Sequence, residues 1–205
     1  LYYLGELNQT HYHKPLPAIG INYRRSYQKR LALNYQIALG RIQGADSNST
    51  DPRLVNRNLS FRSDLAEASL CLEINYFEFE KNSTKHWATP YLFFGFSFFY
   101  SNPQALQNGE WRNLQAIGTE GQGRGQAPRY NLFNFAIPLG IGFKANLSDK
   151  LSVTFFTGMR KTFTDYIDDV GGVYASPSLF DAADAALADP SKQSNPVNGT
   201  NQGID

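Results

Sequence analysis

The chain has 205 residues, room for one domain, and a formal net charge of +1 from 19 basic and 18 acidic residues. This balance gives no indication of a nucleic-acid or other polyanionic partner. Charged residues make up only 18% and aromatic residues 14%, with 17 glycines, a mixture that is typical of β-rich chains. No run approaches the roughly 18 apolar residues that a spanning helix requires.

The first part of the chain contains three expected strands. Leu1–Leu7 is interpreted as the end of a strand that starts upstream, and Ala18–Tyr27 as a second strand with weak alternation. The clearest alternation lies in Arg30–Ile42, where the odd positions from Leu31 to Leu39 are all apolar and the even positions are small or polar. This apolar face matches the roughly 9–11 residues with which a tilted strand crosses a bilayer.

Four later segments repeat the alternation, each with one continuous apolar or aromatic face. They are Leu59–Glu80, Ala88–Tyr100, Tyr130–Ala145 and Leu151–Phe163. Pro138 lies in the middle of the third segment, and because it cannot donate a ladder hydrogen bond, a local bulge is expected there.

The connections between the seven strands alternate in length. Short turns are expected at Ser26–Lys29, Lys81–Trp87 and Asn146–Lys150, and long loops at Asn8–Leu16, Gly44–Asn58, Ser101–Arg129 and 164–205. Short turns on one side and long loops on the other are typical of bacterial outer-membrane barrels, with the short side periplasmic.

The sequence therefore predicts an all-β fold: one antiparallel eight-stranded transmembrane β-barrel domain over residues 1–205, with short periplasmic turns and long extracellular loops. Seven strands are visible, and because lipid tolerates no open sheet edge, a closing strand is expected after Asp205. Residues 164–205 would form the long extracellular loop before it. A soluble barrel or sandwich remains the alternative.

Several polar residues lie on the small, polar faces of the strands. An eight-stranded barrel is filled by side chains, so we expect these residues to form a lumenal network of ion pairs. A carboxylate pair for acid–base chemistry is the less favoured interpretation. The residues are Glu67, Glu73, Asn75, Lys144 and Arg160, with Arg24 on the equivalent face of its strand.

Two loop motifs have the composition of metal sites. His11 and His13 are spaced to share one side of an extended segment, as two metal ligands would be. The acidic residues Asp165, Asp168 and Asp169 could offer oxygens to Ca²⁺, but without EF-hand spacing. We interpret both as polar loops, and predict no metal and no cofactor.

Three other features favour structural roles. The glycine-rich GTEGQGRG segment, from Gly118 to Gly125, lies between two strands and is therefore neither a dinucleotide fingerprint nor a P-loop. Phe180–Ala188 is expected to form a short alanine-rich helix. Cys71, the single cysteine, is expected to be a buried inert thiol.

The order of several strings resembles the PorG-like family of outer-membrane barrels from about Tyr2 to Tyr174. The strings are YYLGELN, PAIGINYRRSY, RNLSFRSDLAEASLCLEINYFEF, ATPYLFFGFSFFYSNP, TEGQG and RKTFTDYIDDV. The resemblance implies an accessory component of the type 9 secretion system, a machine linked in some species to gliding motility. It also implies association with a periplasmic ring of a PorK/GldK-like lipoprotein and a PorN/GldN-like protein, and no enzymatic activity. Family members end in a further aromatic-rich strand, whereas this chain ends in a polar segment.

The expected function is thus a non-enzymatic barrel in the cell outer membrane, surrounded by its lipid, that anchors the periplasmic ring. Contact with the ring is expected at the basic short-turn side. The alternatives are a barrel enzyme acting on lipid or peptide, a small-solute channel, and an adhesin. The expected contact residues are Arg24, Arg25, Lys29, Arg30, Lys81, Trp87 and Lys150.

Overall fold

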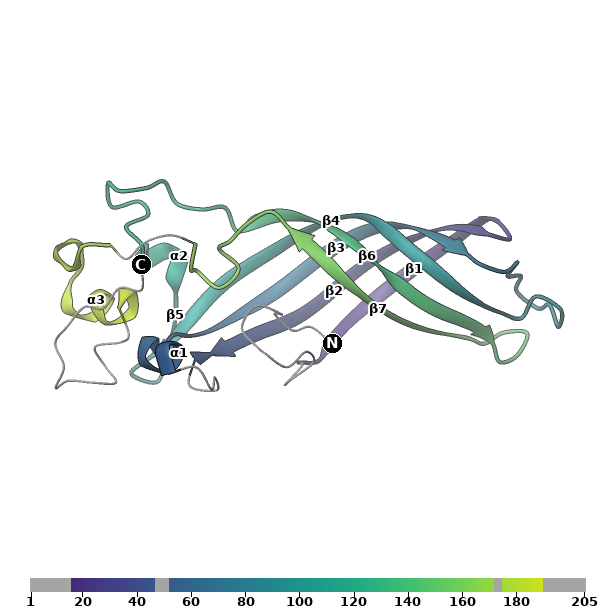
Figure 1. The fold of residues 1–205 in the computed structure, drawn as a ribbon, viewed down its shortest axis with the longest axis horizontal. Coiled ribbons are helices and arrows are strands. Elements are labelled where there is room, and N and C mark those ends of the chain that lie inside the picture. The colour runs from purple at the N-terminus through teal and green to yellow at the C-terminus, as the bar shows by residue number, and fades with distance from the viewer. Residues whose placement is uncertain (1–15, 47–51, 172–174, 190–205) are drawn as a thin grey trace.

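The computed structural model describes residues 16–46, 52–171 and 175–189, and within them the dominant feature is one antiparallel sheet of seven strands (Figure 1). The sheet order is β1-β2-β3-β4-β6-β7, and β5 pairs with β4. The strands are β1 (Ala18–Gln28), β2 (Leu31–Ala45), β3 (Ser60–Asn75), β4 (Ala88–Gln107), β5 (Glu110–Asn113), β6 (Phe133–Asn146) and β7 (Ser152–Thr162). The helices are short: α1 (Pro52–Arg57), α2 (Leu114–Ile117), the 3-10 helix η3 (Pro177–Leu179) and α3 (Ala182–Ala188).

Six of the expected strands are present, and the expected strand Leu1–Leu7 lies outside the described residues. The prediction that Ser101–Arg129 is all loop is wrong. Strand β4 continues to Gln107, and Asn108 and Gly109 turn the chain into β5 with φ values of 51° and 86°. Two successive left-handed residues make the tight turn that suits an antiparallel hairpin, and Asn-Gly is the dipeptide that adopts it most readily.

The end of β3 also differs from the prediction. Strand β3 stops at Asn75 instead of Glu80, so the connection to β4 is longer than the expected turn Lys81–Trp87. The Phe79 amide donates to the Lys29 carbonyl, and the Asn146 amide donates to the Trp87 carbonyl. The connection therefore crosses the end of the sheet between the β1–β2 turn and the β6–β7 turn, and its backbone groups are satisfied there.

Pro138 interrupts pairing without shifting it. Phe94 pairs with Leu139 and Ser97 with Ala136, which is the same register on both sides of the interruption. The bulge expected at Pro138 is thus absent, and the irregularity of the sheet lies instead between Ser26 and Gln28 in β1.

The two faces of the sheet have opposite character to those of a water-soluble domain. Large apolar side chains point outward, with Ile37 65%, Phe96 68% and Phe155 70% exposed. The inner face holds buried polar groups, among them Glu73 and Lys144, each 1% exposed. The alternation in the sequence therefore places the apolar residues outside and the charged residues inside.

The sheet curls around this inner face. Arg24 of β1 donates through Nη1 to the Thr154 hydroxyl of β7 over 3.4 Å, although these are the first and last strands of the order. Arg160 of β7 likewise reaches Glu67 of β3. No ladder joins β1 to β7 in the described part of the chain, so these two strands are the edges of an unclosed curl.

The hydrogen-bond register reveals the tilt of the strands. One row of paired residues runs through Leu31, Ile74, Leu92, Ile141 and Thr157. At one end, the row includes Leu31, which pairs with Gln28 and closes the β1–β2 turn. At the other end, Ile141 and Thr157 each lie five residues from the pair Asn146–Ser152 that closes the β6–β7 turn. Five residues are about 17 Å along a strand, and the two turns are four strand spacings apart, about 19 Å. The two turns lie at one level only if the strands tilt by about 40°.

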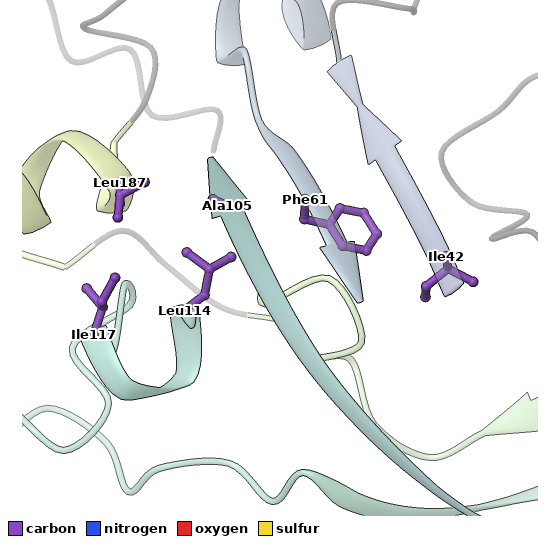
Figure 2. Packing of buried hydrophobic residues seen from close by; sticks show 6 residues of the cluster. All are labelled: Ile42, Phe61, Ala105, Leu114, Ile117 and Leu187. Atoms are coloured by element: carbon purple, nitrogen blue, oxygen red, sulfur yellow. The ribbon is translucent and has the colours of Figure 1, made fainter. Parts of the chain in front are cut away.

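A conventional hydrophobic core is found at the loop side, the end opposite the short turns, where α2 and α3 lie (Figure 1). We call this assembly of loops and helices the loop-side cap; it comprises the described residues 101–132 and 164–189. Helix α3 confirms the short helix expected at Phe180–Ala188, beginning two residues later. The core residues are Ile42, Phe61, Ala105, Leu114, Ile117 and Leu187 (Figure 2), with Leu65, Ile167 and Phe180 packed against them.

Candidate functional site

The first candidate site is a charged cluster inside the curl, centred on Glu73 of β3. Arg24 donates to both Glu73 oxygens, over 2.7 Å from Nε and 3.1 Å from Nη2. The Lys144 ammonium lies 2.5 Å from Glu73 Oε2, donates to Asn75 Oδ1 over 2.9 Å, and lies 4.2 Å from the centre of the Tyr91 ring. Two cations thus outnumber the one carboxylate, and each of these three charges has a partner of opposite sign.

A second interior pair lies further toward the loop side. Arg160 Nε donates to both oxygens of Glu67, over 2.9 and 2.7 Å. Glu67 and Glu73 therefore belong to two separate ion-pair clusters, and each is held by a cation instead of by the other carboxylate. Cys71, between them on β3, is buried and free of any disulfide. This arrangement neutralises charge across the curl and joins β3 to β1, β6 and β7.

Aromatic rings fill the space beside these pairs, packed on glycines of the inner face. A Cβ added to Gly140 would lie 2.6 Å from the Phe93 ring and 2.3 Å from the Thr157 carbonyl oxygen. A Cβ on Gly158 would lie 2.7 Å from the same ring, and Phe93 also meets Phe156 edge to face at 6.0 Å. Only glycine at 140 and 158 lets the Phe93 ring approach the opposite wall so closely.

The second candidate site is the turn side, formed by the β1–β2, β3–β4 and β6–β7 connections. Arg25, Arg30, Lys81, Trp87 and Lys150 are all exposed there, as an interaction surface requires.

Two predicted members of the turn side are already engaged by other groups. Lys29 forms a salt bridge of 3.0 Å with Glu80, which raises the pKa of its ammonium group through that hydrogen bond and charge. Arg24 points inward to Glu73, so we remove it from the expected contact set. The alternation of β1, although weak in the sequence, already placed Arg24 on the inner face with the other lumenal residues.

The turn side also carries exposed apolar groups. Tyr76 and Phe77 meet edge to face with ring centres 4.8 Å apart, and Leu147 and Leu151 of the β6–β7 connection are exposed. Leu147 was not among the expected contact residues, although an apolar residue within a polar turn is a signal of contact with a partner or lipid.

The loop-side cap contains a buried carboxylate. Asp169 accepts hydrogen bonds from the Thr119 hydroxyl and from the Tyr130 hydroxyl, and Tyr130 stacks on Tyr166 at 4.6 Å. Burial raises the pKa of Asp169 to about 7, against the two hydrogen bonds that lower it, and Glu120 and Asp168 raise it further. Burial beside Asp169 also raises the pKa of Tyr130. Asp169 thus fastens residues 164–171 to the loop that follows β5.

The metal-site candidates find no support in the geometry. Among the residues that the structure describes, no group of three or more His, Cys, Asp or Glu side chains is arranged to hold a metal ion. Asp169 bonds to hydroxyl groups, and the Asp168 carboxylate accepts from the backbone amide of Val170. His11 and His13 lie outside the described residues.

The comparisons with known proteins give one result. No curated protein and no solved structure matches the chain significantly. None of the helices within 16–46, 52–171 and 175–189 is long and apolar enough to cross a membrane. One family model, described as "Domain of unknown function (DUF6089)", matches residues 1–176, which is most of the chain. The chain therefore belongs to the DUF6089 family.

Proposed function

We propose that the protein is a non-enzymatic, eight-stranded outer-membrane β-barrel that anchors the periplasmic lipoprotein ring of the type 9 secretion system. The observation that supports a barrel is the distribution of side chains on the two faces of the sheet, with apolar side chains outside and paired charges inside. A water-soluble domain rarely leaves such a continuous apolar face exposed, whereas a barrel in lipid requires it.

The height of the apolar face supports the same proposal. On β2 the outward residues are apolar from Leu31 to Leu39, and the next outward residue is Arg41, which pairs with Asp64 of β3. The ten residue steps from Leu31 to Arg41, at a tilt of about 40°, span about 25 Å along the barrel axis, the height of the apolar band of outer-membrane barrels. The Arg41–Asp64 pair then marks the loop-side edge of the hydrocarbon.

Closure of the barrel would use two further strands at the free edges of β1 and β7. A strand preceding β1 and a strand following β7 would bring the six long strands to eight, an even number as in bacterial single-chain barrels. The tilt of about 40° lies within the 35–45° that closed barrels adopt.

The anchoring role is supported by the interior, the turn side and the resemblance to PorG-like barrels. The Phe93 ring and the pairs around Glu73 and Glu67 lie inside the curl, and side chains that occupy the interior oppose a solute channel. The exposed cations and aromatic rings of the turn side offer a surface for a periplasmic PorK/GldK-like lipoprotein and its PorN/GldN-like partner. Such surfaces combine charge steering with apolar anchoring residues.

Site-specific crosslinking in cells tests this orientation. Cys71 is buried, so cysteines introduced by Lys81→Cys, Lys150→Cys and Arg25→Cys would be the reactive thiols of the described surface. We expect crosslinks from these turn-side positions to the ring lipoprotein, and none from the matched exposed position Glu110→Cys at the loop side. Crosslinks to the ring from Glu110→Cys alone would reverse the orientation and remove the anchoring proposal.

The loop-side cap favours one second candidate, an adhesin-type barrel, because the loops are packed around a core instead of extending separately. Deletion of residues 177–189 distinguishes the two functions. Loss of attachment with intact secretion would favour the adhesin, and loss of secretion with intact attachment would exclude it.

A further inference from the structure

Strands β2, β3 and β4 extend past the apolar band at the loop side, and the outward face of this extension is largely polar, although Leu106 is also exposed on it. Arg62 of β3 pairs in the ladder with Gln104 of β4, two residues beyond the Asp64–Asn102 pair. The β5 strand adds Trp111 and Asn113 to the same face, since Asn113 pairs with Gln104.

Arg62 is held rigidly on this face. Its Nε donates to the Gln104 side-chain oxygen over 3.0 Å, and its guanidinium lies 3.7 Å from the centre of the Trp111 ring. Gln104 in turn donates to Asn113 over 2.7 Å, which fixes the amide that holds the arginine. Within the described residues, neither terminal nitrogen of Arg62 makes a hydrogen bond. A stacked guanidinium with two available amino groups is pre-organised for an anion with several oxygens.

The neighbouring acid does not cancel this charge. Asp64 is held by Arg41 through two hydrogen bonds, so the Arg41–Asp64 pair is neutral and Arg62 supplies the excess positive charge of the patch. Anions are therefore attracted to Arg62 and not repelled by Asp64.

The level of Arg62 identifies the anion. In the proposed barrel the Arg41–Asp64 pair marks the edge of the hydrocarbon, and Arg62 lies two residues beyond Asp64, which is about 5 Å toward the loop side at a strand tilt of about 40°. The polar headgroup layer of a bilayer begins at the edge of the hydrocarbon and is on the order of 5–8 Å thick. Arg62 would therefore lie at the level of the headgroup phosphates and not of the acyl chains.

We propose that this outward face, centred on Arg62, binds the phosphorylated sugar headgroup of an outer-leaflet glycolipid. Arg62 binds the phosphate through its terminal amino groups, and the exposed part of Trp111 with the Asn113 amide contacts the sugar. This inference rests on the proposed function in one respect, because membrane insertion is what places the face in the outer leaflet.

The test measures binding of diphosphorylated lipid A to the full-length protein, folded in detergent, by native mass spectrometry and tryptophan fluorescence. Arg62→Gln should weaken binding about ten-fold or more, because charge-assisted hydrogen bonds to the phosphate are lost. The affinity of Arg62→Lys should be intermediate, since lysine keeps the positive charge but lacks the two terminal amino groups of the planar guanidinium. The matched control is Arg25→Gln, an outward arginine that lies over Tyr27 at 5.2 Å on the opposite end of the sheet and should bind as wild type does.

Three outcomes would overturn the inference. They are wild-type affinity in Arg62→Gln, equal affinity of the wild type for dephosphorylated lipid A, and full displacement by millimolar inorganic phosphate, which would indicate a generic anion site. Folding is checked in each variant by heat-modifiable electrophoretic mobility. If the folded protein binds lipid A equally well with and without Arg62, only this inference is overturned. If the protein never inserts into lipid vesicles, the proposed function is overturned.

Discussion

The strand region and the loop-side cap of this protein are built on opposite principles. The strand region buries the charged side chains of Glu67, Glu73 and Lys144 and exposes Phe96 and Phe155, whereas the cap buries Leu114 and Ile117 in a conventional core. Both are encoded in one chain of low mean hydropathy. The difference agrees with the surroundings that the proposed barrel would give each region: water around the cap, and for the strands an apolar medium outside and a polar interior.

The largest expected effect comes from removing the acid at the centre of the interior. Glu73→Ala leaves Lys144 buried and Arg24 without its carboxylate, so we expect the free energy of unfolding to fall by about 3–5 kcal/mol. Urea denaturation of the detergent-folded protein, followed by tryptophan fluorescence, measures this loss. The exposed acid Glu110, changed to alanine, is the control and should alter stability by less than about 0.5 kcal/mol. Equal stability of the two variants would show that the interior pairs do not hold the strands together.

A smaller effect is expected at the outward face, and its size depends on the surroundings. Phe96→Lys at the mid-height of β4 should cost about 2–4 kcal/mol in lipid vesicles, because a cation would face hydrocarbon. Leu106→Lys, on the same strand but beyond the apolar band, should be near neutral. Stability of both variants in vesicles, measured by denaturant titration, checks the difference. If Phe96→Lys is also neutral, the outward face does not contact lipid.

The smallest effect is expected in the cap and depends on pH. Asp169 has a pKa of about 7 in the folded cap and an ordinary value of 3.8 when exposed. Between these values the folded cap binds a proton that the opened cap does not, so cap stability falls as pH rises from about 4 to 7 and is then constant. We expect the cap to be about 2 kcal/mol less stable at pH 8 than at pH 5.5. Amide hydrogen exchange of residues 114–132 and 164–171 at the two pH values, corrected for intrinsic exchange rates, measures this difference in cap stability.

Asp169→Asn supplies the control for the pH effect. The amide oxygen accepts from one of the two hydroxyls, Thr119 or Tyr130, and the amide NH2 donates to the oxygen of the other. Asparagine also suits the left-handed backbone at this position, where φ is 72°. Protection of the cap should then no longer depend on pH over this range. A persistent dependence would assign the titration to Glu120, Asp168 or another group.

The strand region was largely predictable because two-residue alternation is a local signal. It placed Glu67, Glu73 and Lys144 on the inner face and Leu31–Leu39 on the outer one, as the structure has them. Which acid meets which base was not predictable, since this depends on the registers of ladders between strands distant in sequence. Glu73 reaches Arg24, 49 residues before it in the sequence, and Lys144, 71 residues after it, only after the sheet has curled.

The cap was poorly predicted, for two different reasons. The β4–β5 hairpin carried a local signal, Asn108-Gly109, that outweighs the loop-like composition around it. The packing of α2 and α3 carried none, because helices of four and seven residues have no stable amphipathic pattern of their own. Their positions are set by burial of Leu114, Ile117 and Leu187 against the strand ends, which is a tertiary effect.

The five-residue stagger between the two short turns means that hydrogen-bonded neighbours are not neighbours in depth. The row Leu33, Leu72, Phe94, Leu139 and Met159 is continuous in the ladders. At a tilt of about 40°, the last residue of this row lies about 12 Å further along the axis of the curled sheet than the first. In the proposed barrel, a substitution at Leu33 would therefore lie near the rim of the bilayer, while one at Met159, in the same row of paired residues, would lie in its interior.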